Sequence, residues 1–273
     1  MFFHLYNKDC RNMDMIEDNS VDLVVTSPPY YSAKDYGSGK EKGEIGAGVS
    51  YKEYLNDMEQ VFRNCYRVLK SGRFMAINIS NILVDTVTIP VPYDFFNILR
   101  NIEDLYYNEC PIWTKPEGML SQNRAGGWLQ FPYPRRIHYN RLYEFIFIFR
   151  KGVQDLSFTQ SDDKMLKDNV LEKNKEYLND VWYFPCASAS DEKHPAPYPV
   201  ELPRRCIRLY TFKGEVVLDP FNGSGTTGLA CKEEGRSYIG FDISAEYIEL
   251  AKKKIGWKIG SLFEDEVEYK VFK

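Results

Sequence analysis

The chain has 273 residues, of which 44% are apolar and 15% aromatic, and its net charge is −4. This length and composition predict one substantial hydrophobic core with, at most, a small appended subdomain. No stretch approaches the roughly 18 uncharged apolar residues of a membrane span, and the N-terminus lacks the features of a signal peptide. The six cysteines are scattered without a CxxC pair, which is typical of a reducing cytoplasm and argues against a disulfide framework and a structural zinc site.

Strands and helices alternate along the chain. The helix expected at 51–70 carries apolar residues at helical spacing, and the expected strands are short apolar runs. Such alternation predicts an α/β fold with a mainly parallel sheet and helices on both faces. In chain order, the expected elements are a strand at 20–26, a helix at 51–70, strands at 73–79, 142–150 and 215–220, a helix after Gly225, a strand at 237–242 and a helix at about 244–256.

The stretch VTSPPYY, residues 25–31, ends the first buried strand abruptly. Proline lacks a backbone N–H and forces the residue before it into extended geometry, so residues 27–30 must form a stiff, non-helical turn. In open α/β sheets, ligands bind at the carboxyl ends of the strands. The turn is therefore predicted to line a ligand site.

A glycine-rich turn follows a strand near the other end of the chain. The stretch VLDPFNGSGTTGLAC, residues 217–231, ends a strand in Asp219, turns at Gly223 and Gly225, and enters an apolar helix. The start of that helix brings backbone N–H groups close to a ligand. Asp242 closes the next strand, where a carboxylate can accept both hydroxyls of a ribose. The polar surroundings of a pyrophosphate are missing, which favours a nucleoside without phosphates; the alternative is a tight turn that binds nothing.

These motifs resemble those of amino-group DNA methyltransferases. DPFNGSGTT is similar to their S-adenosylmethionine loop, TSPPY to their catalytic motif, KHPAPYPVELPRRCI (193–207) to the segment before the loop, and NKDC (7–10) to their GDC motif, with Lys8 in place of the glycine. The catalytic motif comes first and the cofactor loop last, which is the circular permutation of the β class. The resemblance spans residues 5–256. It implies a Rossmann-like, S-adenosylmethionine-dependent methyltransferase fold, circularly permuted, with a small inserted recognition region.

The resemblance also implies roles for individual residues. Acceptors on the turn would hold the amine of an extruded base while a tyrosine stacks on it, and neither a covalent intermediate nor a metal is required. For His194, a surface histidine ahead of a proline turn is the alternative. The implied catalytic residues are Ser27, Pro28, Pro29 and Tyr30, and the implied cofactor-binding residues are Asp9, His194, Pro195, Asp219, Pro220, Phe221, Asn222, Gly223, Ser224, Gly225, Thr226 and Asp242.

The target base is predicted from one position of the catalytic motif. In the family, serine at the first position accompanies methylation of cytosine N4, whereas aspartate mostly accompanies adenine N6, so Ser27 favours cytosine. Adenine N6 stays open as the alternative. Two other classes, an NAD-dependent dehydrogenase and a non-catalytic DNA-binding relative, share parts of the pattern. Neither explains an intact TSPPY turn together with the glycine-rich loop.

Recognition of DNA must come from outside these motifs. Between Trp113 and Lys151, basic residues outnumber acidic ones, and a local basic patch can bind phosphates although the whole chain is acidic. The candidates for DNA contacts are Arg124, Arg135, Arg136 and Arg141. The glycine-rich loop at 31–48 is expected either to close over a flipped base or to be a plain connector.

The expected organisation is one methyltransferase domain with an insertion. Residues 1–150 form its catalytic half, 151–185 a short inserted target-recognition segment, and 186–273 its cofactor-binding half. The expected partner is double-stranded DNA, and a cognate restriction endonuclease and a second copy of the chain are left open. No membrane partner is expected.

Overall fold

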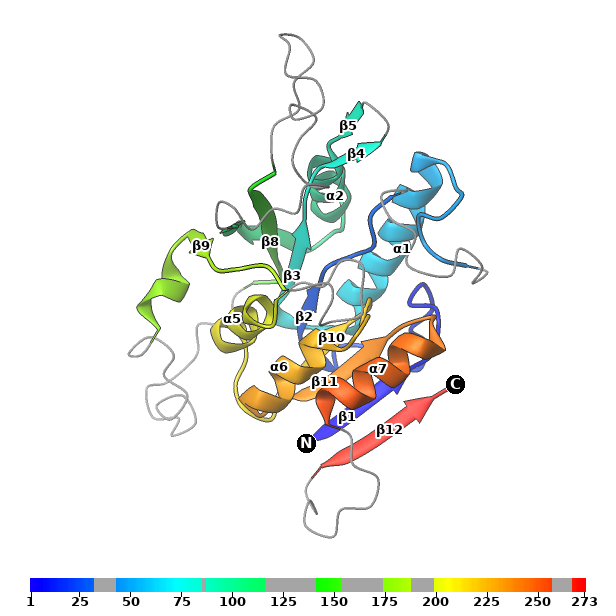
Figure 1. Ribbon diagram of the computed structural model, residues 1–273, viewed down its shortest axis with the longest axis vertical. Coiled ribbons are helices and arrows are strands. Elements are labelled where there is room, and N and C mark those ends of the chain that lie inside the picture. The colour runs from blue at the N-terminus through cyan, green and yellow to red at the C-terminus, as the bar shows by residue number, and fades with distance from the viewer. Residues whose placement is uncertain (32–42, 85–86, 116–140, 154–173, 188–198, 257–266) are drawn as a thin grey trace.

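The computed structural model describes residues 1–31, 43–84, 87–115, 141–153, 174–187, 199–256 and 267–273. Its main element is a ten-stranded sheet in the order β12-β1-β11-β10-β2-β3-β8-β7-β9, with β6 also paired to β8 (Figure 1). Ten strands have the bounds β1 Phe2–Tyr6, β2 Val21–Thr26, β3 Leu69–Ile79, β6 Leu105–Glu109, β7 Ile112–Thr114, β8 Tyr143–Lys151, β9 Val181–Tyr183, β10 Val216–Asp219, β11 Ser237–Phe241 and β12 Glu268–Phe272. A separate hairpin pairs β4 (Ile82–Val84) with β5 (Val87–Ile89).

Most strands of the main sheet point the same way, as the alternation of elements predicts. The strands from β12 to β3 pair in parallel, whereas β8 pairs antiparallel with β3, β6 and β7. The edge strand β9, at residues 181–183, pairs in parallel with β7. The end of the predicted recognition segment 151–185 is therefore a strand of the main sheet.

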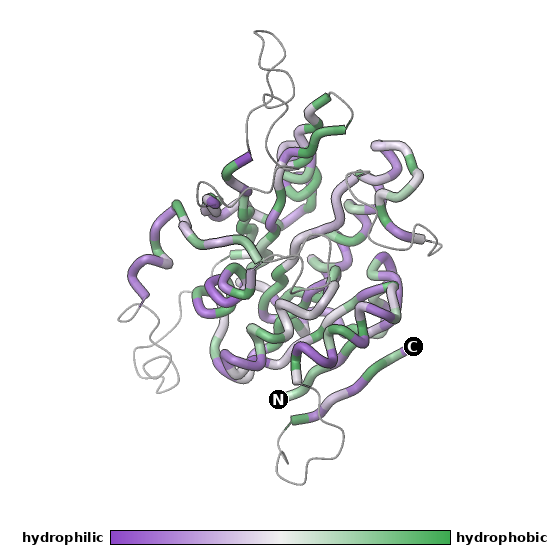
Figure 2. Tube along the Cα trace, in the orientation of Figure 1, coloured by the Kyte–Doolittle hydropathy of each residue, from purple (hydrophilic) through white to green (hydrophobic). Residues whose placement is uncertain are grey.

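Helices cover both faces of the sheet. The helices are α1 Tyr51–Val68, α2 Val91–Arg100, α5 Glu201–Tyr210, α6 Thr226–Glu234 and α7 Ala245–Ile255, with the 3₁₀ helix η3 at Lys175–Leu178. One buried cluster joins α1 and α2 to the sheet, and a second joins α5, α6 and α7 to it. Figure 2 shows hydrophobic segments concentrated in the central strands and hydrophilic segments along the outer helices. None of the helices in the described ranges has the length and apolar character needed to span a bilayer.

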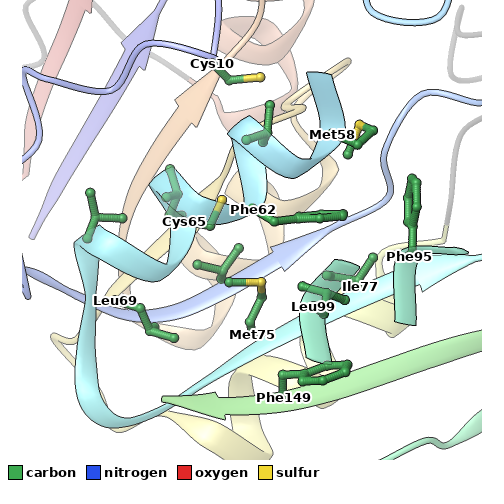
Figure 3. Packing of buried hydrophobic residues seen from close by; sticks show 14 of the residues in the cluster. Cys10, Met58, Phe62, Cys65, Leu69, Met75, Ile77, Phe95, Leu99 and Phe149 are labelled. Atoms are coloured by element: carbon green, nitrogen blue, oxygen red, sulfur yellow. The ribbon is translucent and has the colours of Figure 1, made fainter. Parts of the chain in front are cut away.

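Helix α1 is fixed at both ends. Ser50 and Glu53 form a capping box that satisfies backbone N–H groups at its start. Its apolar stripe places Met58, Phe62 and Cys65 over β3, β8 and α2 (Figure 3). At its end, the buried ammonium of Lys151 donates hydrogen bonds to backbone carbonyls of the last turn. These contacts hold the helix, and thus its first turn, in place beside the end of β2.

Candidate active site

Two neighbouring parallel strands, β10 and β2, carry the two predicted motifs at their carboxyl ends. From β10 the chain continues through α6 to β11 on one side, and from β2 it continues through α1 to β3 on the other. Connections that leave adjacent strands in opposite directions open a crevice at the strand ends, where ligands bind in open α/β sheets. The fold thus brings together two motifs whose strand-end residues, Thr26 and Asp219, are 193 positions apart in the chain.

Asp219, the last residue of β10, ties the two strand ends together. Its carboxylate is fully buried and accepts hydrogen bonds from the Thr26 hydroxyl at 2.8 Å, the Thr227 hydroxyl at 2.6 Å and the Phe221 backbone N–H at 3.0 Å. Thr26 ends β2 and directly precedes Ser27. The Asp219 side chain therefore links the end of β2, where the predicted catalytic turn begins, to the first turn of α6.

Three residues of the predicted catalytic turn, Ser27, Pro29 and Tyr30, are partly exposed, whereas Pro28 is buried. Tyr30 packs with one side against the core cluster under α1. A ring that is supported from below and partly open above is suited to stacking on a planar ligand.

Within the cofactor loop, most side chains face the protein. Gly223 and Phe221 are partly exposed. Asn222 is buried, accepts a hydrogen bond from the Tyr238 hydroxyl at 2.9 Å and donates one to the Gly223 carbonyl at 2.7 Å. The amide of Asn222 thus shapes the loop from beneath. The other predicted cofactor residues of this loop are buried: Pro220, Ser224, Gly225 and Thr226.

Gly225 is required by its surroundings. Its φ of +85° lies in the left-handed region, and a Cβ built on it would stand 2.7 Å from the Ala251 Cβ of α7. Such an approach is closer than real side chains allow, so a larger residue would push α7 away from the loop. Gly225, which belongs to the predicted cofactor loop, is therefore also needed for the packing of α7.

Asp242 stands where the sequence predicts a ribose acceptor, just past the end of β11. Its carboxylate accepts hydrogen bonds from the backbone N–H groups of Gly223 at 2.8 Å and Ser244 at 2.9 Å. Each carboxylate oxygen can accept a second hydrogen bond, and the residue is partly exposed, so its geometry fits two ribose hydroxyls. Asn7 donates to the carbonyls of Asp242 at 3.0 Å and Ile243 at 2.9 Å and fixes this turn. No role was predicted for Asn7, although it lies in the NKDC motif.

Asp9 is held by an arginine that lies just outside the NKDC motif. The Arg11 guanidinium donates to both Asp9 oxygens and also reaches Asp57 of α1 at 2.9 Å and the Gly43 carbonyl at 2.8 Å. Hydrogen bonding to Asp9 raises the pKa of Arg11 above its usual value. The Asp9 side chain is about one third exposed, at 37%. The Arg11 backbone N–H also donates to Asp9 Oδ1 at 2.8 Å, so Arg11 fixes the orientation of this carboxylate.

Comparison with known proteins bears on this arrangement. The family model described as DNA methylase (N6_N4_Mtase) matches residues 21–253, which include both strand ends. The chain belongs to this DNA methylase family. The methylase is 30% identical to the type II methyltransferase M.MjaI of Methanocaldococcus jannaschii, over 92% of this chain and 90% of that protein. It is 28% identical to M.HpaI of Haemophilus parainfluenzae, over 88% of this chain and 69% of that protein.

The likeness to M.BslI of a Bacillus strain, at 29% identity, covers 88% of this chain but only 26% of that protein. Among solved structures, TTHA0409 of Thermus thermophilus superposes with a TM-score of 0.74 at 25% identity, covering 99% of this chain and 100% of that one. PvuII DNA methyltransferase superposes with a TM-score of 0.70 at 19% identity, covering 97% and 91%. The predictions of the family and of the Rossmann-like methyltransferase fold are confirmed, which removes the dehydrogenase alternative.

The basic stretch of the methylase is only partly available to DNA. Lys115 forms a salt bridge of 2.5 Å with Glu144, the Arg150 side chain donates to the Gly152 carbonyl, and Lys151 caps α1. These three cations serve the fold, so the interpretation of the whole stretch as a phosphate-binding patch is too broad. Their partners lie far away in the sequence or on the backbone, where charge counting does not find them.

Among the candidates for DNA contacts, Arg141 lies in the described part of the chain. Burial lowers its pKa, and an electrostatic interaction with Tyr30 opposes that shift. Arg141 is therefore close enough to Tyr30 of the predicted catalytic turn for the two side chains to interact electrostatically. Several predicted residues lie outside the described ranges: Arg124, Arg135, Arg136, His194, Pro195 and residues 32–42 of the glycine-rich loop.

A lysine from α7 supports the cofactor loop from behind. The Lys254 ammonium donates to the hydroxyls of Ser224 at 2.9 Å and Thr226 at 3.1 Å. Burial lowers the pKa of Lys254 to about 8. The loop therefore rests on a partly desolvated cation whose charge changes near neutral pH.

Proposed function

We propose that this methylase is a site-specific enzyme that methylates the N4 amine of a cytosine flipped out of duplex DNA. One observation carries the proposal: the turn Ser27–Tyr30 and the cofactor loop start at adjacent strand ends and are joined by the hydrogen bond between Thr26 and Asp219. A base held by the turn would therefore lie next to a cofactor held by the loop.

S-adenosylmethionine is the cofactor, and its sulfonium supplies the methyl group. TTHA0409 and M1.HpyAVI, which share this fold, have each been solved in complex with it. In this chain Asp242 would accept the ribose hydroxyls, and Asp9 the amine of the adenine. Phe221 and Gly223, the partly exposed residues of the loop, are placed to contact the rest of the molecule.

The turn supplies orientation and hydrogen-bond acceptors. An exocyclic amine is a poor nucleophile because its lone pair is delocalised into the ring, so the enzyme must hold the nitrogen where it can pyramidalise. The Ser27 hydroxyl and the Pro28 carbonyl are the proposed acceptors for the two N–H groups. The Tyr30 ring is the proposed stacking face for the extruded base, and Arg141, which interacts electrostatically with Tyr30, adds a cation in its surroundings. The proton released by the amine passes to solvent.

The choice of cytosine N4 depends on Ser27. A serine hydroxyl accepts one N–H bond without placing a full negative charge beside the base, and serine at this position resembles the cytosine type. Adenine N6 is the alternative within the same family, because the acceptors of the turn suit either amine. We further propose that residues 151–185 and the arginines near Arg141 select the DNA site. A cognate restriction endonuclease and a homodimer are proposed partners, in line with type II methyltransferases among the relatives.

The deciding experiment identifies the modified base. Unmethylated DNA made by amplification is incubated with the pure protein and S-adenosylmethionine, digested to nucleosides and analysed by mass spectrometry. We expect N4-methylcytosine, and the Ser27→Ala variant should form it more slowly. N6-methyladenine would support the alternative, and unmodified DNA would refute the proposal. Sequencing of the modified DNA gives the recognition site.

A further inference from the structure

The catalytic turn is held from the helix side by a buried tyrosine of α1. The Tyr54 hydroxyl donates a hydrogen bond of 2.9 Å to the Pro29 carbonyl, and the Tyr54 side chain is fully buried. We propose that Tyr54 is a positioning residue for methyl transfer, which sets the orientation of the Tyr30 ring through this carbonyl. The inference rests on the proposed role of the turn and adds a residue outside the recognised motifs.

Two prolines make an external anchor necessary. Pro28 and Pro29 have no backbone N–H, so neither residue can donate a backbone hydrogen bond that would fix the turn from within. Their rings fix φ, which leaves the rotation between Cα and carbonyl as the main freedom of each residue. At Pro29 that rotation turns the peptide plane that leads into Tyr30. A donor fixed on the Pro29 carbonyl thus determines where the Tyr30 ring points.

The position of the Tyr54 hydroxyl is itself well determined. Tyr54 lies in the first turn of α1, where its backbone N–H donates to the carbonyl of Ser50 inside the capping box. Its ring packs between the rings of Tyr51 and Phe95, with centroids 5.9 Å away in both cases. A buried ring with neighbours on both sides has little rotamer freedom. The Tyr54 hydroxyl therefore has a well-defined position relative to the turn.

A second contact with the catalytic turn comes from Gly46. Gly46, with φ of +87°, passes so near that a Cβ built on it would stand 3.2 Å from the Tyr54 ring and 3.5 Å from the Tyr30 carbonyl. The other end of the turn is pinned by the Thr26 hydroxyl on Asp219. The turn is thus held at both ends by hydrogen bonds, one from helix α1 and one to the neighbouring strand β10.

The test removes one hydroxyl and keeps the ring. In Tyr54→Phe we expect the single-turnover rate of methyl transfer to DNA to fall roughly 10- to 100-fold, because small misplacement of a reacting group has effects of this size. The affinity for S-adenosylhomocysteine should stay within about twofold, since the cofactor loop starts from the other strand. The matched control is Tyr51→Phe, which removes a partly buried hydroxyl from the same aromatic cluster, one that donates to Asp94 at 2.6 Å. It should keep the wild-type rate.

The outcomes separate the inference from the proposed function. Wild-type rate in Tyr54→Phe, or equal rate losses in both phenylalanine variants, would overturn the positioning role while leaving the function intact. Parallel losses of rate and cofactor affinity would show that Tyr54 only supports the fold. If the wild-type protein modifies adenine, the inference stands and the assigned base fails. If Tyr30→Ala and Ser27→Ala both keep full activity, the turn is not catalytic and both proposals fail.

Discussion

Replacing Thr26 with valine tests whether the two halves of the site depend on one buried carboxylate. Valine keeps the shape of threonine and its preference for strands, but it removes the hydroxyl that donates to Asp219 at 2.8 Å. The carboxylate is fully buried and keeps the Thr227 hydroxyl and the Phe221 N–H as donors. The substitution thus removes a hydrogen-bond donor from a fully buried carboxylate.

The expected loss follows from hydrogen bonds to charged groups. Such bonds contribute about 1.5 to 3 kcal/mol, so the free energy of unfolding should fall by this amount. For a chain of this length, that corresponds to a melting temperature lowered by roughly 3 to 5 °C. Urea unfolding followed by circular dichroism measures the first quantity, and calorimetry measures the second. Because Thr26 precedes Ser27 directly, single-turnover methyl transfer should also slow down.

A matched pair of variants gives the control. Thr227→Val removes the other hydroxyl from Asp219, but on α6, in the cofactor half. It should destabilise the protein by a similar amount and weaken S-adenosylhomocysteine binding more than Thr26→Val does. Thr26→Ser, which keeps the hydroxyl, should recover most of the stability. Unfolding free energies of Thr26→Val and wild type within about 0.5 kcal/mol of each other, the usual range for inert substitutions, would refute the reasoning.

Three further changes address the rest of the site. Asp242→Ala should weaken cofactor binding by on the order of 1.5 to 3 kcal/mol, because a charged acceptor is lost; unchanged affinity by calorimetry would mean that the cofactor is placed wrongly. Tyr30→Ala should keep the affinity for S-adenosylhomocysteine and strongly reduce single-turnover methylation, since stacking contributes ~1 to 3 kcal/mol; full activity would remove the turn from the mechanism. Burial lowers the pKa of Lys254 from 10.5 to about 8, so the native state binds fewer protons than the unfolded state between these values, and stability gains from this group as pH rises from 8 to 10.5. In Lys254→Met, the free energy of unfolding measured with urea should therefore rise less between pH 7.5 and pH 10 than in the wild type. The same rise in both proteins would contradict the assigned environment.

The central elements of the fold could be predicted from the sequence because their patterns are local. The strands at β2, β3, β8, β10 and β11 are apolar runs bounded by turns, and α1 has a regular apolar stripe. The two strands at one end of the sheet, β12 and its neighbour β1, could not be predicted for a physical reason. β1 is stabilised by pairing with β11 and β12, which lie near the other end of the chain, and β12 itself is half exposed and charged. Such strands gain their stability from tertiary contacts that no local pattern records.

The candidate site likewise contains residues that the sequence predicts and residues that it does not. The motif residues were recognisable because special backbone chemistry, such as two successive prolines or a glycine with positive φ, is visible in the letters. The residues that hold the motifs were not. In the sequence, Tyr54 is one more apolar position of a helical stripe. Asn7 belongs to a motif but has no predicted role, and Thr26 is simply the end of a strand. Each acts through one polar atom whose partner is distant in the sequence.

Arg11 shows how far this positioning extends. The role proposed for Asp9 is to accept a hydrogen bond from the cofactor, yet both of its oxygens already accept hydrogen bonds from Arg11. Oδ1 also accepts the Arg11 backbone N–H, so the contacts with Arg11 already occupy about four acceptor sites, and a cofactor amine would have to share or displace one of them. Because Arg11 also binds Asp57 of α1 and the Gly43 carbonyl, the orientation of Asp9 depends on the helix that carries Tyr54. Helix α1 therefore positions Asp9, the proposed adenine acceptor, through Arg11, and the predicted catalytic turn through Tyr54.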